Sequence, residues 1–226
     1  MVSSRALQAM SDSIVRLVKE SLTPMDAKER ESVHKDSWFS TMKRDRAAFK
    51  SAISFELVLQ KLQALYDEQG LLTEMEIAVL ECIHYLMNVE GPLQTISAQL
   101  CLYAVKAGSS FEVRRGTQID RILTSEAILD TSMDEKLRFL ASCHVRIPPG
   151  IWNRKLRNSV AHMDFSIKAD GTVGYDNEEI SYAKLQRLVW NTRDVFVAMQ
   201  RAVAGVVGAF LKKDGWTGPL PLPLSK

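Results

Sequence analysis

The sequence predicts an all-α protein, an antiparallel bundle of about six to eight helices with one small β-hairpin. Apolar residues recur at three- and four-residue intervals through most of the 226-residue chain, as in helices that bury one face. Gly and Pro separate these periodic segments. A chain of this length can bury a substantial core, so we expect one domain over 1–212 and a Pro-rich tail over 213–226.

The first predicted helix covers 7–22 and ends at Thr23-Pro24. The charged stretch 25–36 fits either a solvated helix or a flexible connection. A second periodic segment covers 44–69 and is followed by Gly70, a residue typical of helix ends.

A third helix should begin at Thr73, because Thr73 and Glu76 have the spacing of a capping box. Gly91-Pro92 should end it. The next segment, 96–105, is apolar on nearly every side and is expected at the centre of the bundle, with Gly108 as its terminator.

In the second half, two short helices are predicted over 118–129 and 134–144, before Pro148-Pro149 breaks the chain. A helix from about 150 to 163 follows. Asp170-Gly171 is a turn signal, which predicts the small hairpin. Its strands are 165–167 and 172–175, and a last long helix covers 182–211.

Charge and composition limit the functional classes. The net charge of +2 means that any RNA contact must be local, and the strongest basic excess lies in 43–50 and 146–157. Such runs are usually solvated faces. The three cysteines are scattered and the four histidines form no cluster, so we expect free thiols, no metal and no cofactor.

The chain is expected to be cytoplasmic. Residues 1–10 contain one Arg and no apolar stretch of signal-peptide length. The most apolar segment, 202–211, is about ten residues long, whereas crossing a bilayer takes roughly 20. No membrane partner is therefore expected.

The predicted helix 150–163 has two faces that differ in character. At 100° per residue, one face collects apolar residues and should pack on the core: Trp152, Leu156, Val160 and Met163. The opposite face presents the following residues: Arg157, Ala161, Asn158, His162 and Arg154. This second face is the candidate functional site.

Three of its residues suit RNA cleavage without a metal ion. His162 is the candidate proton donor or acceptor, because an unperturbed imidazole titrates near neutrality. Arg157 stays protonated and offers a planar set of donors to phosphate oxygens. Asn158, four positions before His162, could orient the imidazole. One histidine cannot easily serve as base and acid, so we expect a homodimer that pools two copies of the helix near the small Ala161.

The stretch Arg157-Asn158-Ser159-Val160-Ala161-His162 resembles the motif of HEPN domains, in which Arg, commonly followed by a polar residue, precedes His by four to six positions. The resemblance covers 151–211, including the hairpin and the long final helix, and extends only as helix order to 57–108. It implies a helical, usually dimeric bundle. Many members are metal-independent ribonucleases of toxin, phage-defence or RNA-processing systems, often with an antitoxin or defence-system partner.

By this resemblance, Arg157 and His162 have catalytic roles and Asn158 an orienting one, with RNA as the substrate. Many toxin members have Tyr two places after the His, whereas this chain has Asp164. Other members are inactive and bind RNA, a nucleotide or a protein partner, which gives the alternative function.

A third interpretation is a helical interaction protein in which the motif is accidental. About 0.3 Arg–His pairs at this spacing are expected by chance in such a chain. In this interpretation His162 lies near a helix C-terminus because a positive charge is favoured there, and Arg157 pairs with a carboxylate such as Asp164. Arg138 and His144 also fit the looser spacing, and we interpret them as structural. Glu90, beside Gly91-Pro92, could reach the arginine but is explained equally well as a helix-end carboxylate.

Overall fold

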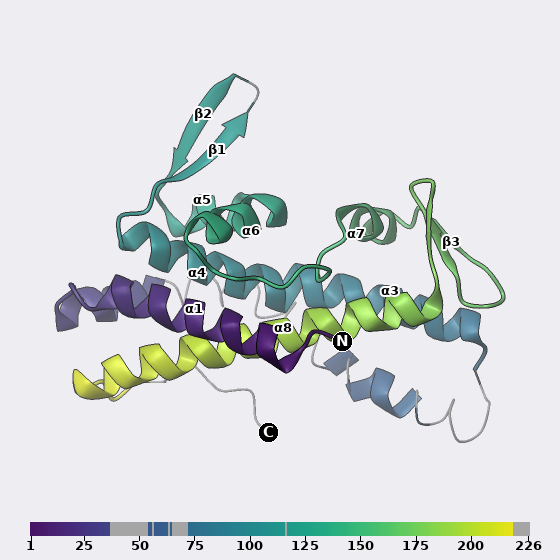
Figure 1. Cartoon of the computed structure of the whole chain (residues 1–226), viewed down its shortest axis with the longest axis horizontal. Coiled ribbons are helices and arrows are strands. Elements are labelled where there is room, and N and C mark those ends of the chain that lie inside the picture. Colours follow the sequence, from purple (N-terminus) through teal and green to yellow (C-terminus); the bar gives the residue numbers. More distant parts are fainter. Residues whose placement is uncertain (37–53, 56, 63, 65–71, 116, 219–226) are drawn as a thin grey trace. The chain divides into compact units, whose positions relative to one another are not determined.

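The computed structural model describes residues 1–36, 54–55, 57–62, 64, 72–115 and 117–218. These residues are mostly helical and include two small antiparallel sheets (Figure 1). The prediction of a helix-rich chain is therefore confirmed, but the protein is not purely all-α. The chain divides into two compact units, one built from 47–93 and 149–194 with Met1, the other from 2–46, 94–148 and 195–226.

The first unit contains the predicted motif. Its described elements are α3 (Glu74–Asn88), η1 (Val89–Leu93), α7 (Arg154–Ala161), β3 (Phe165–Ile167), β4 (Val173–Tyr175), β5 (Glu178–Ile180) and the start of α8 (Tyr182–Lys213). Helix α7 contacts α3 on one side and β4 on the other. The motif helix is thus held between a long helix and a small sheet.

Helix α3 begins as predicted. The Thr73 hydroxyl accepts a hydrogen bond from the Glu76 backbone N–H at 3.3 Å, and the Glu76 carboxylate accepts one from the Thr73 N–H at 2.8 Å. Gly91-Pro92 does not end the helix, contrary to the prediction. Residues Val89–Leu93 form a π-helical turn, and α4 (Gln94–Lys106) follows directly. A wider turn accommodates Pro92, which has no N–H and cannot fit a regular α-helix interior.

The predicted hairpin is confirmed, with Phe165 opposite Tyr175 and Ile167 opposite Val173. A third strand, β5, was not predicted and pairs with β4. The turn before it places both Asp176 and Asn177 at positive φ, 43° and 60°. Asp and Asn are among the residues that tolerate this conformation, so the pair was the signal for a second hairpin.

The second unit contains α1 (Ser4–Leu22), α4, β1 (Phe111–Arg115), β2 (Gln118–Ile122), α5 (Ser125–Asp130), α6 (Met133–Ser142) and the rest of α8. The first helix and the central position of α4 are confirmed, since every residue from Thr95 to Ala104 is buried. Gly108, at φ 94°, closes α4 as predicted. Residues 27–36 are helical, so most of the charged stretch 25–36 is a helix and not a flexible connection.

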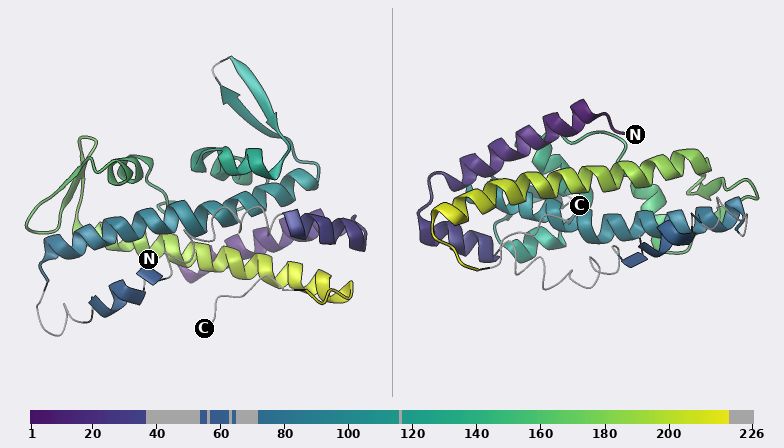
Figure 2. Two further views of the ribbon diagram at one scale, coloured as in Figure 1. Left: turned by 180° about the vertical axis from the view of Figure 1, so that it is seen from behind. Right: turned by 90° about the horizontal axis from the view of Figure 1, so that it is seen from below.

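The prediction of a helix over 118–129 is wrong in its first half. Strand β2 occupies Gln118–Ile122 and pairs with β1, and only α5 is helical; Figure 2 shows this hairpin extending away from α5 and α6. Phe111 and Val113 point inward while Glu112 and Arg114 are exposed, the alternation of a strand with one buried face. The second short helix, α6, lies within the predicted 134–144 apart from its first residue and ends two residues early.

Helix α8 matches the predicted last helix and buries its apolar stripe, including Leu185, Val189, Val195 and Met199. Its length and composition would allow it to cross a membrane, but half of its most apolar window is buried inside the protein. Core helices of soluble proteins pass the same test, so this is weak evidence for a membrane span.

Several predictions fall outside the described residues. Of the helix predicted over 44–69, residues 54–55, 57–62 and 64 are described, and these are helical. The tail from 219 onward is not described. Helix α8 extends to Lys213, and the next residue, Asp214, pairs with Arg30. One domain over 1–212 remains a prediction.

Gly171 occupies a turn that only glycine fits well. Its φ is +72°, and an added Cβ would lie 3.1 Å from the Glu74 carbonyl oxygen and 3.1 Å from the Tyr182 Cβ. Gly171→Ala should therefore lower the free energy of unfolding by about 2–3 kcal/mol, measured by urea denaturation. Gly150→Ala is the matched control, because Gly150 has φ +74° and open space around it. The control should cost about 1 kcal/mol, and equal losses in the two variants would contradict the crowding argument.

Stability at acid pH should depend on Asp214. Arg30 donates two hydrogen bonds to this carboxylate, at 2.6 and 2.8 Å, and holds its pKa below the ordinary value. A lowered pKa contributes stability that is present above the unfolded pKa of about 4 and is lost as pH falls through the folded pKa. The Tm of the wild type should thus fall more steeply below about pH 4 than that of Asp214→Asn. If the Tm of the two proteins falls in parallel with pH, the Arg30–Asp214 ion pair does not contribute to stability at acid pH.

Candidate functional site

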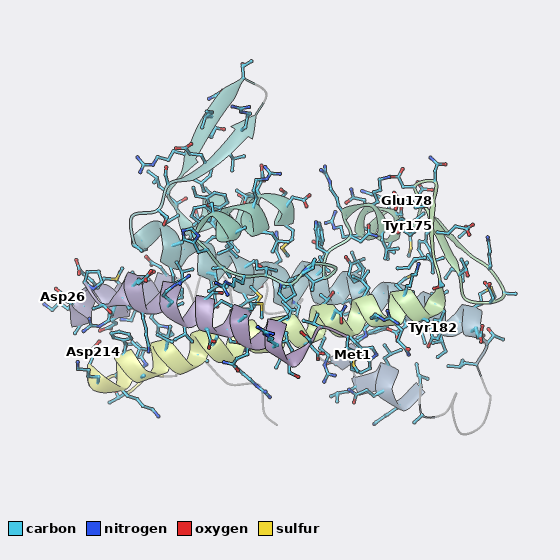
Figure 3. All side chains as sticks on the ribbon, in the orientation of Figure 1. Met1, Asp26, Tyr175, Glu178, Tyr182 and Asp214 are labelled. Atoms are coloured by element: carbon cyan, nitrogen blue, oxygen red, sulfur yellow. The ribbon has the colours of Figure 1, made fainter. Side chains whose placement is uncertain are left out.

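Helix α7 starts at a well-defined cap. The Asn153 side-chain oxygen accepts a hydrogen bond from the Leu156 N–H at 3.0 Å, so the helix begins at Arg154 rather than near 150 as predicted. The Asn153 amide also donates to the Tyr175 hydroxyl at 3.0 Å, which ties the cap to the small sheet. Figure 3 labels Tyr175 on this sheet, beside α7.

Tyr85 fixes the same cap from the side of α3. Its hydroxyl accepts a hydrogen bond from the Asn153 backbone N–H at 2.7 Å and can donate to the Asn153 carbonyl at 3.4 Å. Tyr85 is fully buried, and burial raises the pKa of its phenol well above the ordinary value. The hydroxyl therefore remains protonated, and it serves as a neutral anchor for the start of α7.

The apolar face of α7 is confirmed only in part. Leu156 and Val160 are buried, and Trp152 is half-buried ahead of the helix. Met163, predicted in the core, is 78% exposed. The helix ends before it, with Met163 at φ 56° and the Asp164 N–H donating to the Ser159 carbonyl at 2.8 Å. This left-handed residue turns the chain, so helical periodicity no longer predicts which way Met163 faces.

Arg157 is partly exposed and paired with Glu90. Its Nε donates to a carboxylate oxygen of Glu90, and the side chains are 30% and 42% exposed. This hydrogen bond raises the pKa of the Arg157 guanidinium, which therefore keeps its charge. Of the two carboxylates considered from the sequence, the partner is Glu90 and not Asp164. Glu90 comes from η1, so the π-helical turn supplies the acidic group of the site.

Asn158 contacts Arg157 rather than His162. Its side-chain oxygen accepts a hydrogen bond from Arg157 Nη1 at 2.9 Å. Within the described residues no hydrogen bond joins the Asn158 amide to the His162 imidazole. Asn158 was expected to contact the imidazole, whereas it contacts the guanidinium. Glu90 and Asn158 together hold Arg157.

His162 is the C-cap of α7 and is exposed, as are Ala161 and Met163. Its backbone N–H is bonded to the Asn158 carbonyl at 3.0 Å, which fixes where the residue sits. The imidazole is therefore accessible to a ligand. Neither Arg157 nor His162 is buried. The two side chains are therefore not core residues.

Two residues around the motif had no signal in the sequence, Tyr85 and Tyr175, and Glu90 was one of two candidate carboxylates for the arginine. Each comes from a segment distant in the chain, so spacing gives no indication of its position. Lys155, next to the motif, is engaged by Glu178 at 2.7 Å and Asp176 at 3.4 Å. Its charge is therefore partly neutralised, as is that of Arg157 by Glu90.

The part of the chain that the structure describes contains no group of three or more His, Cys, Asp or Glu side chains that could hold a metal ion. No family model matches the chain, and neither a curated protein nor a solved structure matches it significantly. The site must therefore be interpreted from its own residues.

The cap of α7 should control local stability. Asn153→Ala removes the bond to Leu156 and the donor to the Tyr175 hydroxyl, so it should lower the free energy of unfolding by about 1–3 kcal/mol in urea denaturation. Asn153→Asp keeps a capping oxygen, to which the tyrosine can donate, and should cost less than about 1 kcal/mol. An alanine variant as stable as the wild type would show that the cap does not hold α7.

Proposed function

We propose that the chain is a metal-independent endoribonuclease of the HEPN type that acts as a homodimer. The observation that carries the proposal is the arrangement at the end of α7. There a guanidinium held by Glu90 and Asn158 and the exposed imidazole of His162 lie five residues apart on one short helix. The resemblance to the HEPN motif supports the same assignment.

The chemistry proposed is an internal transesterification. The 2′-oxygen of a ribose attacks the adjacent phosphorus, its proton passes to a base, and the bond from phosphorus to the 5′-oxygen breaks as that oxygen takes a proton. The products are a 2′,3′-cyclic phosphate and a 5′-hydroxyl. Arg157 would stabilise the charge that builds on the non-bridging oxygens, and His162 would transfer a proton.

Two proton transfers require two groups, and each chain supplies one exposed histidine in this motif. A second copy that packs its α7 against the first near Ala161 would provide the other imidazole. Ala161 is small and exposed, which permits close approach of two helices. The proposed dimer would then carry two Arg157 and two His162 side chains around one cleft.

The biological role proposed is that of a cytoplasmic toxin or phage-defence effector, regulated by a cognate antitoxin or another partner of the defence system. A ribonuclease that acts on cellular RNA needs such control. The RNA that it cuts is proposed to be single-stranded or looped, since attack by the 2′-oxygen requires a backbone free to align in line with the leaving oxygen.

A second candidate is a catalytically inactive HEPN module that binds RNA, a nucleotide or a protein partner through the same face. One observation favours it: two of the Arg157 donor groups are already engaged by Glu90 and Asn158, and Asn158 does not contact His162. In this case Arg157 and His162 would bind a phosphate without proton transfer.

The test is digestion of a single-stranded RNA in EDTA by the wild type, His162→Ala and Arg157→Ala. Each substitution should lower the cleavage rate by at least about 100-fold, the usual contribution of a proton-transfer or charge-stabilising group. Arg138→Ala, which removes an exposed arginine from α6, outside the motif helix, is the matched control and should retain most of the activity.

Cleavage by His162→Ala at the wild-type rate would contradict the proposed mechanism. RNA binding without cleavage by the wild type, weakened by Arg157→Ala, would identify the inactive module. Sedimentation analysis tests the dimer separately. A wild type that cleaves RNA as a monomer would exclude the shared cleft while leaving the arginine and histidine in place.

A further inference from the structure

A polar hollow lies in the second unit, between α1 and the segment that follows α6. It has a volume of about 540 Å³, within the range of roughly 300–1,000 Å³ typical of small-molecule sites. The side chains that line it include Arg16 and Glu20 from α1 and Cys143, His144 and Arg146 from the segment after α6. The motif on α7 contributes no residue to it.

A hydrogen bond joins the two walls of this hollow. The Arg146 backbone N–H donates to the Ser13 hydroxyl at 3.0 Å, and that hydroxyl donates in turn to the Met10 carbonyl at 2.6 Å. Ser13 is 6% exposed. Arg16 and Glu20 follow Ser13 by three and seven positions, so they share its face of the helix. The face of α1 that fixes the segment is therefore the face that lines the hollow.

The hollow has an excess of positive charge. Arg16 and Arg146 are always protonated, and within the described residues no carboxylate forms an ion pair with either guanidinium. Glu20 is the single acidic side chain in the lining. Two guanidinium groups that face one space without a counterion repel each other, and an anion bound between them would remove that repulsion.

The segment after α6 begins with a tight turn that caps the end of the helix. His144 adopts φ 61°, its N–H donates to the Ala141 carbonyl at 3.0 Å, and the Val145 N–H donates to the Leu140 carbonyl at 3.0 Å. These bonds give partners to two carbonyls of the last turn of α6, which the helix itself leaves unpaired. The His144 imidazole is exposed and offers a further hydrogen-bond donor.

We propose that this hollow binds a small phosphate monoester that also carries hydroxyl groups. Arg16 and Arg146 bind the phosphate through their planar donor groups, and Glu20 accepts a hydrogen bond from a hydroxyl of the same ligand. A monoester is favoured over a diester because its three terminal oxygens offer more acceptors to the two planar guanidiniums. A sugar phosphate and a nucleoside monophosphate share this chemistry, and the experiment distinguishes them.

Cys143 provides a local probe of binding. It lines the hollow and is partly exposed, whereas Cys82 and Cys101 are buried and burial raises the pKa of the Cys82 thiol to about 12. A thiol reagent should therefore label Cys143 first. Ribose 5-phosphate or adenosine 5′-monophosphate should slow this labelling, while ribose and adenosine should not. Protection by the nucleotide alone would assign the ligand as a nucleoside monophosphate.

Arg16→Ala and Arg146→Ala should each weaken this protection, with an apparent Kd raised about tenfold or more. Arg138→Ala, an exposed arginine on α6 that does not line the hollow, is the matched control and should bind like the wild type. His144→Gly should raise Tm, because glycine adopts this φ without strain, and should still lose affinity. If His144→Gly is at least as stable as the wild type and yet binds the monoester more weakly, the loss of binding is not caused by unfolding.

Three results would overturn the proposal. Labelling of Cys143 that neither monoester slows would show that no such ligand binds. Equal protection by adenosine would show that the phosphate is not recognised. Unchanged protection in Arg16→Ala and Arg146→Ala would show that the arginines do not hold it. None of these outcomes depends on RNA cleavage or on His162.

Discussion

The hydroxyl of Tyr85 lies inside the protein, and a hydroxyl that is buried without a partner costs stability. Its partner is the backbone of Asn153, which leaves the Asn153 side chain to cap α7 and to reach Tyr175. One buried group thus sets where α7 begins. Since the helix has eight residues, the position of its start also sets the positions of Arg157 and His162.

The same helix that carries Tyr85 supplies the acidic partner of the arginine. Glu90 follows Tyr85 by five residues and lies in the π-helical turn that accommodates Pro92. π-Turns inside long helices are uncommon and are frequently found at functional sites. Here the turn keeps the helix continuous into α4 and places a carboxylate next to Arg157. A helix that stopped at Gly91, as the sequence suggested, would have given Glu90 no defined neighbour.

Local patterns predicted much of this structure. The capping box at Thr73, the hairpin turn at Gly171 and the long final helix depend on residues close together in the chain, and all three are present. The hairpin β1–β2 was missed because its second strand, Gln118–Ile122, was interpreted as the start of the helix that follows. Its alternation, Phe111 and Val113 against Glu112 and Arg114, was nevertheless visible.

The site was predictable only along α7. The sequence placed Arg157, Asn158 and His162 on one face; in the structure Arg157 and Asn158 lie within α7 and His162 is its C-cap. It could not choose Glu90 over Asp164 as the partner of the arginine, because that choice depends on how α7 packs against α3. The separate hollow at Arg16 and Arg146 joins residues that are 130 positions apart, a distance over which periodicity carries no information.

Helix α4 has no solvent-facing side between Thr95 and Ala104, whereas α7 buries only Leu156, Ser159 and Val160. Evolution should therefore treat the two helices differently. Almost any replacement in α4 changes core volume, so invariance there would report packing alone. On α7 the exposed positions can vary at little cost, and a residue that stayed constant among relatives would have to be retained for another reason. In an alignment of divergent sequences, conserved residues at the exposed positions of α7 would therefore identify the functional surface more clearly than conserved residues in α4.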